Sequence, residues 1–375
     1  MLGVTGSIGR QALEVAARLD LPVPVIAAGR GSDSLMETAR ALPDAAVVVA
    51  VPTHGEREVF REVLGARVSF GTGALTEAAS LPGTTVVNGI VGAAGLPASV
   101  AALDAGNRLA LANKESLVAG GPVVLAALES GGGELIPVDS EHSALAQCLE
   151  GEEIGAVRRL ILSASGGPFR GRDAADLEGV TVEQALDHPT WSMGPRITID
   201  SATLMNKAFE VIEAHHLFGV DYDRIDVVVH PQSTVHSLIE FVDGSLKAHL
   251  GEPDMRVPIQ YAITYPHRAP GTLDEFSLAG RSLTFEAPDP EVFPCLQLGY
   301  EAGRAGGSAP AVLNAADEIA VQAFLERRIG FSSIAAIVEQ TLEKVEHRDL
   351  GTIGDVLDAD GEARGAARAL VGGSC

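Results

Sequence analysis

The peptide PVDSEH at residues 137–142 carries the side chains best suited to holding a metal ion. It follows the apolar pair at 135–136, which predicts the end of a β-strand. Because side chains alternate along a strand, Asp139 and Glu141 would point to the same side, and Ser140 to the other. Two carboxylates held together repel unless a cation or a proton lies between them. Oxygen ligands suit Mg²⁺ or Mn²⁺, and a pair of solvated acids is the alternative.

A second candidate is the run DSATLMNKAFE, which begins at Asp200. Asp200 or Ser201 is suited to capping a helix. Asn206, Lys207 and Glu210 are three or four residues apart and would share one side of that helix. Glu210 would supply a third oxygen ligand, and Lys207 with Ser201 and Asn206 would form an anion site. A salt-bridged exposed helix face would show the same pattern.

Two loops offer further groups. SGGPFR, starting at Ser165, combines a hydroxyl with free backbone N–H groups suited to a phosphate, with a plain turn as the alternative. HPTWSMG, from His188 to Gly194, has neither helical nor strand period and contains Trp191, the only tryptophan of the chain. A loop with a large aromatic residue indicates a lid, here near 186–196, and packing of Trp191 in the core is the alternative.

Glycines at every third position, Gly3, Gly6 and Gly9, precede a helical pattern. Such a turn between a strand and a helix lets the backbone approach a pyrophosphate at the helix N-terminus. Only Met1 and Leu2 precede Gly3, whereas a central strand has about five residues. We therefore expect a short, weak first strand or a start further upstream.

The next strand, expected over 23–28, ends at Gly29, Arg30 and Gly31. An acid at this point binds the ribose hydroxyls of NAD, whereas Arg30 favours the 2′-phosphate of NADP. A surface arginine in a turn is the alternative. Lys114 follows a later strand, expected over 108–112, at the carboxyl edge where such sheets bind ligands.

Alternating strands and helices predict an α/β fold with an N-terminal doubly wound, Rossmann-type parallel sheet. A central α+β catalytic domain and a C-terminal α-helical domain would follow. Strands are expected at 46–51, 68–70, 84–87, 160–162, 225–229 and 235–241, and C-terminal helices at 310–329, 334–345 and 361–370. The expected domains are 1–138, 139–265 and 295–375, with a connection over 266–294 that is rich in Pro, Gly and Asp.

The net charge of −23 argues against nucleic acid or an anionic membrane as a partner. No apolar run approaches the length that crosses a bilayer, and the N-terminus lacks a secretion signal. Cys148, Cys295 and Cys375 show no metal or redox spacing and fit a reducing cytoplasm. Lysines are scarce in this chain, so Lys114 and Lys207, which lie within these motifs, are informative about function.

The motifs together resemble the 1-deoxy-D-xylulose 5-phosphate reductoisomerase family over nearly the whole chain. The segments that carry the resemblance are TGSIG (5–9), IVGAAGL (90–96), LANKESLV (111–118), PVDSEH (137–142), SGGPFR (165–170), HPTWSMG (188–194), DSATLMNK (200–207), HPQSTVHS (230–237) and GEPDMR (251–256). Nine such segments in this order are highly specific.

The resemblance implies a cytoplasmic homodimer that uses NADPH and Mg²⁺ or Mn²⁺, with Co²⁺ as a third option. It would convert 1-deoxy-D-xylulose 5-phosphate to 2-C-methyl-D-erythritol 4-phosphate in the non-mevalonate isoprenoid route. The implied metal ligands are Asp139, Glu141 and Glu210, with Lys114 and Ser140 on the substrate oxygens. The implied phosphate contacts are Ser165, His188, Ser201, Asn206 and Lys207, with Trp191 as the lid aromatic. The implied NADPH contacts are Thr5, Gly6, Ser7, Ile8, Gly29, Arg30, Gly31, Asn113, Glu115 and Gly194.

Two positions depart from the family pattern: Val4 replaces a usual serine, and Gly31 stands where asparagine is often found. Two other functions compete. A metal-independent NADP oxidoreductase, such as a semialdehyde dehydrogenase, would need an activated cysteine, and Cys148 lies in no such motif. A non-catalytic nucleotide-sensing module would have no use for three convergent carboxylates and a second anion site.

Overall fold

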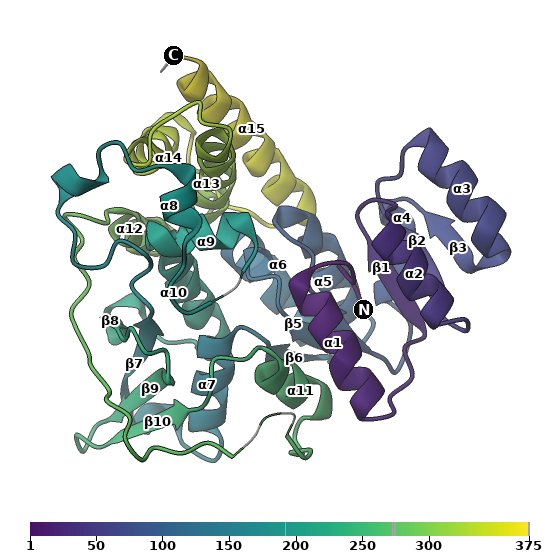
Figure 1. Cartoon of the computed structure of the whole chain (residues 1–375), viewed down its shortest axis with the longest axis horizontal. Helices are drawn as coiled ribbons and strands as arrows, with labels where there is room; N and C mark the ends of the chain where they lie inside the picture. The colour runs from purple at the N-terminus through teal and green to yellow at the C-terminus, as the bar shows by residue number, and fades with distance from the viewer. Residues whose placement is uncertain (192, 272, 274, 374–375) are drawn as a thin grey trace. The chain divides into compact units, whose positions relative to one another are not determined.

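The computed structural model describes residues 1–191, 193–271, 273 and 275–373 (Figure 1). The chain forms two compact units. The first comprises Met1–Ser116, Val123–Asp139 and Asp254–Asp274, and the second comprises Leu117–Pro122, Ser140–Pro253 and Glu275–Cys375. Among the helices of the described residues, none has the length and apolar character needed to span a membrane.

The first unit is built on parallel strands. One sheet has the order β1 (Val25–Ala28), β2 (Ala46–Val49), β3 (Val68–Phe70), and another has the order β4 (Thr85–Asn88), β5 (Arg108–Leu111), β6 (Glu134–Pro137). Leu2 joins them, because it pairs in parallel with both Ala27 and Asn88. The predicted parallel sheet is thus confirmed, and Leu2 forms isolated bridges where the first strand was expected.

Helices alternate with the strands of this unit. They are α1 (Ser7–Arg18), α2 (Asp33–Ala41), α3 (His54–Leu64), α4 (Thr72–Ala79), α5 (Leu96–Asp104) and α6 (Glu115–Gly131). One further helix, α11 (Arg256–Thr264), comes from a later segment of the chain. The start of α3 is set by a capping box, in which Thr53 and Glu56 bond to each other's backbone N–H. Helix α6 departs from helical geometry at Gly120, two residues before Pro122, which lacks the N–H that would continue the ladder.

The second unit contains a mixed sheet of order β10-β9-β7-β8. Its strands are β7 (Val157–Ala164), β8 (Ile225–Val229), β9 (Val235–Phe241) and β10 (Leu246–Leu250). Strands β7 and β8 are parallel, and the other pairings are antiparallel. Strands β8 and β9 were predicted from the sequence, and only the middle of β7 was. Strand β10 was not predicted, although its alternating LKAHL pattern is typical of a half-buried strand.

The remaining helices cover this sheet and form the C-terminal region. They are α7 (Ser140–Leu149), α8 (Val182–Leu186), α9 (Pro195–Ala202), α10 (Met205–Phe218), α12 (Cys295–Ala305), α13 (Ala309–Leu325), α14 (Ser333–Lys344) and α15 (Ile353–Gly373). Short 3₁₀ helices lie at Gly65–Arg67, Ala93–Gly95, Ile154–Ala156, Ala174–Leu177 and Tyr222–Arg224. Helices α13, α14 and α15 pack together as the predicted helical region (Figure 1).

Two local predictions near the candidate site were wrong. Strand β6 ends at Pro137, and Glu141 lies in the first turn of α7, where an acidic side chain complements the helix dipole. Asp200 and Ser201 do not cap a helix, because they occupy the last turn of α9. The chain turns at Leu204, which has the left-handed φ of 61°, and α10 begins at Met205.

Candidate active site

The glycine turn brings helix α1 against the strands. A Cβ on Gly3 would lie 2.4 Å from the carbonyl oxygen of Gly89, and one on Gly9 would lie 2.4 Å from that of Gly3. Both positions therefore require glycine. Gly6 is the N-cap of α1, and no side chain bonds to the first backbone N–H groups of the helix. Of the predicted cofactor residues here, Gly6 and Ser7 are exposed and Thr5 and Ile8 are half-buried, so the helix start is open to a pyrophosphate.

Arg30 follows β1 as predicted, and its side chain remains 60% exposed. Its Nε lies 3.3 Å from Glu56 Oε1. The pKa of Glu56 is below its usual value, first because the backbone N–H of Thr53 donates to it, with smaller contributions from Gly31 and Arg30. A Cβ on Gly31 would meet the Phe60 ring at 2.9 Å, whereas Gly29 has open space around it. Glycine at position 31, where the family often has asparagine, thus avoids a clash with the Phe60 ring.

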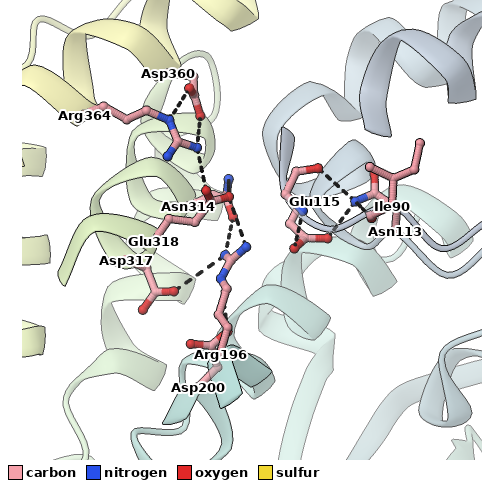
Figure 2. Close-up of polar contacts among 11 residues, drawn as sticks. Ile90, Asn113, Glu115, Arg196, Asp200, Asn314, Asp317, Glu318, Asp360 and Arg364 are labelled. Atoms are coloured by element: carbon pink, nitrogen blue, oxygen red, sulfur yellow. Dashed lines mark hydrogen bonds and ion pairs between the residues drawn. The ribbon is translucent and has the colours of Figure 1, made fainter. Parts of the chain in front are cut away.

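Asn113 and Glu115 support the loop after β4 (Figure 2). The Asn113 amide donates to the carbonyl oxygens of Ile90 at 2.7 Å and Gly92 at 2.9 Å, and to Glu115 Oε2 at 2.8 Å. The other carboxylate oxygen of Glu115 accepts from the Gly92 N–H at 3.0 Å. Both residues therefore fix the backbone at 90–92, and direct contact with NADPH stays a prediction.

Lysines pair with the carboxylates of the two chemical motifs. Lys114 Nζ lies 2.5 Å from Asp139 Oδ2, and both side chains are largely buried. Lys207 Nζ donates to Glu141 Oε1 at 2.9 Å and also contacts Glu210 Oε2. Burial lowers the pKa of Lys207, but Glu141 and Glu210 outweigh it, so the pKa is raised and the ammonium stays charged. The predicted grouping of Lys207 and Glu210 on one helix side is confirmed.

Two groups of three side chains could hold a metal ion among the described residues. In one, the carboxylate oxygens of Asp139, Glu141 and Glu210 lie within 4.8 Å of one another. In the other, Asp139 is joined by His142 and Glu213. The first, oxygen-only group has the donors that Mg²⁺ and Mn²⁺ prefer.

His142 fits a supporting role better than that of a ligand. Its Nε2 lies 2.9 Å from the backbone carbonyl oxygen of Glu210, and its Nδ1 lies 3.3 Å from Glu213 Oε2. Nε2 is therefore hydrogen-bonded and Nδ1 faces a carboxylate, and His142 and Glu213 are fully buried. A buried histidine held in this way can orient the helix that carries a ligand. Neither residue was predicted from the sequence as part of the site.

Three of the five predicted phosphate residues, Ser165, His188 and Ser201, meet at the glycine loop. Ser165 Oγ lies 2.9 Å from His188 Nε2 and 3.5 Å from Ser201 Oγ. His188 Nδ1 accepts the backbone N–H groups of Thr190 and Trp191, so its proton is on Nε2. Burial lowers the pKa of His188, which keeps the ring neutral near pH 7.

The remaining predicted substrate residues are held by carboxylates or belong to the lid segment. Asn206 Nδ2 donates to Glu210 Oε1 at 2.6 Å, and Ser140 Oγ donates to Glu141 Oε2 at 2.5 Å. Trp191 is half-buried, and Gly194 is exposed as the N-cap of α9. Within the expected lid at 186–196, Ser192 lies outside the described residues, as does Cys375 at the C-terminus.

Neither described cysteine is activated. Burial raises the pKa of the Cys148 thiol to about 11 and raises that of Cys295 further. A nucleophilic cysteine requires a lowered pKa, so the dehydrogenase chemistry that would use one has no support here.

A dinucleotide-type sheet with its glycine turn, together with a carboxylate and lysine cluster, defines a metal-assisted, nucleotide-dependent oxidoreductase. Comparisons with known proteins narrow this class. Models of 1-deoxy-D-xylulose 5-phosphate reductoisomerase match residues 1–121, and models of its C-terminal domain match residues 135–218 and 250–366.

Related proteins match this chain along nearly its whole length. The reductoisomerase of Desulforamulus reducens is 48% identical over 99% of this chain and 98% of its own, and that of Xanthomonas oryzae is 50% identical over 97% and 94%. The Zymomonas mobilis enzyme in complex with NADPH superposes with a TM-score of 0.91 at 42% identity, covering 99% of this chain and 97% of its own. A reductoisomerase with NADPH, fosmidomycin and magnesium gives 0.92 at 38% identity, with the same coverage.

The chain belongs to the 1-deoxy-D-xylulose 5-phosphate reductoisomerase family. It is an NADPH-dependent reductoisomerase, as the resemblance found in the sequence implied.

Proposed function

We propose that this chain isomerises and reduces 1-deoxy-D-xylulose 5-phosphate to 2-C-methyl-D-erythritol 4-phosphate around one divalent ion held by Asp139, Glu141 and Glu210. The observation that carries the proposal is the approach of these three carboxylates to within 4.8 Å. A bound Mg²⁺ or Mn²⁺ ion would stabilise the negative charge that develops on the substrate oxygens as a carbon–carbon bond breaks and re-forms. Co²⁺ is a third candidate.

Lys114 and Ser140 are the proposed partners of the reacting oxygens. Lys114 is held beside Asp139 at 2.5 Å, so its ammonium is fixed next to a metal ligand. Ser140 starts α7 and donates to Glu141, so its hydroxyl lies next to a second ligand. A cation and a hydroxyl here would orient the hydroxyketone and stabilise charge without rearranging during the reaction.

Ser165, His188, Ser201, Asn206 and Lys207 are the proposed contacts of the substrate phosphate. The neutral His188 ring presents its Nε2–H toward Ser165, which makes it a hydrogen-bond donor to an anion rather than a counter-charge. Trp191 is the proposed lid residue that excludes water while the reactive aldehyde exists. Lys207 supplies the local positive charge that a substrate needs in a protein of net charge −23.

NADPH would lie on the glycine turn and supply the hydride. The proposed contacts are Thr5, Gly6, Ser7, Ile8, Gly29, Arg30, Gly31, Asn113, Glu115 and Gly194. The exposed guanidinium of Arg30 supports NADP over NAD, because it can meet the 2′-phosphate. Residues 1–138 would thus bind the cofactor, residues 139–265 the metal and substrate, and residues 266–294 would connect them to a helical domain at 295–375.

A homodimer working in the cytoplasm is also proposed, on the family resemblance. Sedimentation of the purified chain at micromolar concentration tests the first part. A mass corresponding to twice 38.8 kDa supports the dimer, and a single chain mass contradicts it.

The reaction is tested by following the loss of NADPH absorbance with 1-deoxy-D-xylulose 5-phosphate. We expect turnover with Mg²⁺ or Mn²⁺, loss of turnover with EDTA, and much slower turnover with NADH. Undiminished turnover in EDTA would favour another NADP-dependent oxidoreductase of a small phosphorylated or carbonyl substrate. Binding of NADPH without turnover at saturating metal would favour a nucleotide-sensing module.

A further inference from the structure

Arg196 links helix α9 to α13 by hydrogen bonds and ion pairs (Figure 2), in addition to the apolar packing of Ile199 and Ala202. Arg196 donates to Asn314 Oδ1 at 2.9 Å and to Glu318 Oε1 at 3.0 Å, both on α13. Its guanidinium also lies 3.6 Å from Asp200, one turn later on α9, and 3.7 Å from Asp317 on α13. The planar guanidinium thus bridges two helices through several atoms, a geometry that a lysine cannot reproduce.

The network around Arg196 continues to a third helix. Arg364 on α15 binds Glu318 Oε2 at 2.7 Å and Asp360 Oδ2 at 2.6 Å. Glu318 therefore accepts from both arginines, one through each carboxylate oxygen. Arg364 ties α15 to α13 and makes none of these contacts with α9.

The cluster contains more acids than bases, since two guanidinium groups face four carboxyl groups. Asp317 is fully buried. Burial and the negative charge of Asp200 raise its pKa well above the usual value. Arg196 is the cation that pairs with both Asp200 and Asp317. Removing it would take this counter-charge away from the buried Asp200 carboxylate, which is strongly unfavourable.

Helix α9 depends on such an attachment. It has 8 residues, its N-cap Gly194 makes no side-chain cap bond, and isolated helices this short are unstable in water. It directly follows Gly194 and carries Ser201 in its last turn. The attachment of α9 therefore decides where Ser201 stands relative to Ser165, now 3.5 Å away.

We propose that Arg196 is a positioning residue that holds α9 on α13 and so places Ser201 for the phosphate of the substrate. This inference rests on the phosphate role proposed for Ser201. Arg196 acts through α9 and touches no reacting atom.

The test compares Arg196→Met with Arg364→Met, which removes a similar guanidinium from the same network without touching α9. KM for 1-deoxy-D-xylulose 5-phosphate, KM for NADPH and the melting temperature are measured for both variants. We expect Arg196→Met to raise KM for the sugar phosphate by about 10-fold or more, equivalent to about 1.4 kcal/mol. KM for NADPH should rise less, because only the proposed contact Gly194, the N-cap of α9, would move with the helix. Arg364→Met lowers the melting temperature but leaves both KM values unchanged.

Two further variants make the result decisive. Arg196→Lys keeps the positive charge but lacks the planar guanidinium, so its KM for the sugar phosphate should lie between those of wild type and Arg196→Met. If Arg196→Met does not fold, Arg196→Lys takes its place in the comparison. An equal rise of KM in the Arg196 and Arg364 variants, or no rise in the Arg196 variants, would overturn the proposal. Ser201→Ala distinguishes the phosphate role of Ser201 from the positioning role of Arg196. An unchanged KM for the sugar phosphate in Ser201→Ala refutes the phosphate role. A raised KM in Ser201→Ala, together with wild-type KM in the Arg196 variants, refutes only the positioning role.

Discussion

Lys207 lies between Glu141 and Glu210, with its Nζ 2.9 Å from Glu141 Oε1 and in contact with Glu210 Oε2. The ammonium is almost completely buried, and so is Glu210. Glu141 belongs to α7 and Lys207 and Glu210 to α10, so this one side chain keeps two proposed metal ligands from different helices close together. Its proposed second role is to contact the substrate phosphate.

Lys207→Ala should therefore damage both stability and substrate binding. Breaking a buried charge pair costs about 3–5 kcal/mol, because it leaves uncompensated charge. We expect a comparable loss of unfolding free energy in urea and a large rise in KM for the sugar phosphate. Lys247→Ala is the control, since its pair with Glu152 is partly exposed and such pairs contribute about 0–1 kcal/mol. Unchanged KM and kcat in Lys207→Ala would show that the lysine does not anchor the phosphate.

Gly167→Ala tests the packing of the phosphate loop on α9. Gly167 has a φ of +64°, and a Cβ there would lie 2.9 Å from the Ser201 carbonyl oxygen. Gly171 has a similar φ of +77° but nothing within 4 Å of a Cβ, so Gly171→Ala carries the backbone strain alone. Each substitution should cost about 1–2 kcal/mol from strain, and only Gly167→Ala should also raise KM for the sugar phosphate. Matching KM values in the two variants would contradict this coupling.

His216 should make the folded chain less stable in mild acid. Burial and the neighbouring His215 lower its pKa from 6.5 to about 4. The unfolded chain therefore binds a proton at higher pH than the folded chain, so the contribution to stability is complete above pH 6.5 and is lost as pH falls toward 4. At 1.36 kcal/mol per pKa unit, the loss is about 3 kcal/mol at most.

The check is urea unfolding at pH 7.5 and pH 4.5. His216→Gln should reduce the difference in unfolding free energy between the two pH values, whereas His54→Gln, which replaces an exposed ring, should not. The same pH dependence in His216→Gln as in wild type would place the titration elsewhere.

The sequence predicted the parts of this protein that local rules determine. The parallel sheet follows from alternating apolar strands and helices, and the close packing at Gly3 and Gly9 follows from residues that only glycine can occupy. Lys207 and Glu210 were placed together because i,i+3 neighbours share a helix side, and the structure confirms their contact.

Other features depend on long-range contacts that spacing does not encode. The break at Leu204 requires a left-handed φ at a residue type that rarely adopts it, so one continuous helical pattern concealed two helices. Asn314 and Glu318 become partners of Arg196 only when α9 and α13 pack together. The only local signal for that network was the i,i+4 spacing of Arg196 and Asp200.

The metal site is tested most directly by the dissociation constant of Mn²⁺, measured from the free-ion signal in electron paramagnetic resonance. The two candidate groups share Asp139 but differ in their other members, so Glu141→Gln and Glu213→Gln separate them. We predict that Glu141→Gln weakens Mn²⁺ binding by about 10-fold or more, in the range typical of altered metal sites, whereas Glu213→Gln has a clearly smaller effect. Wild-type affinity in Glu141→Gln, together with lost affinity in Glu213→Gln, would contradict the proposed site.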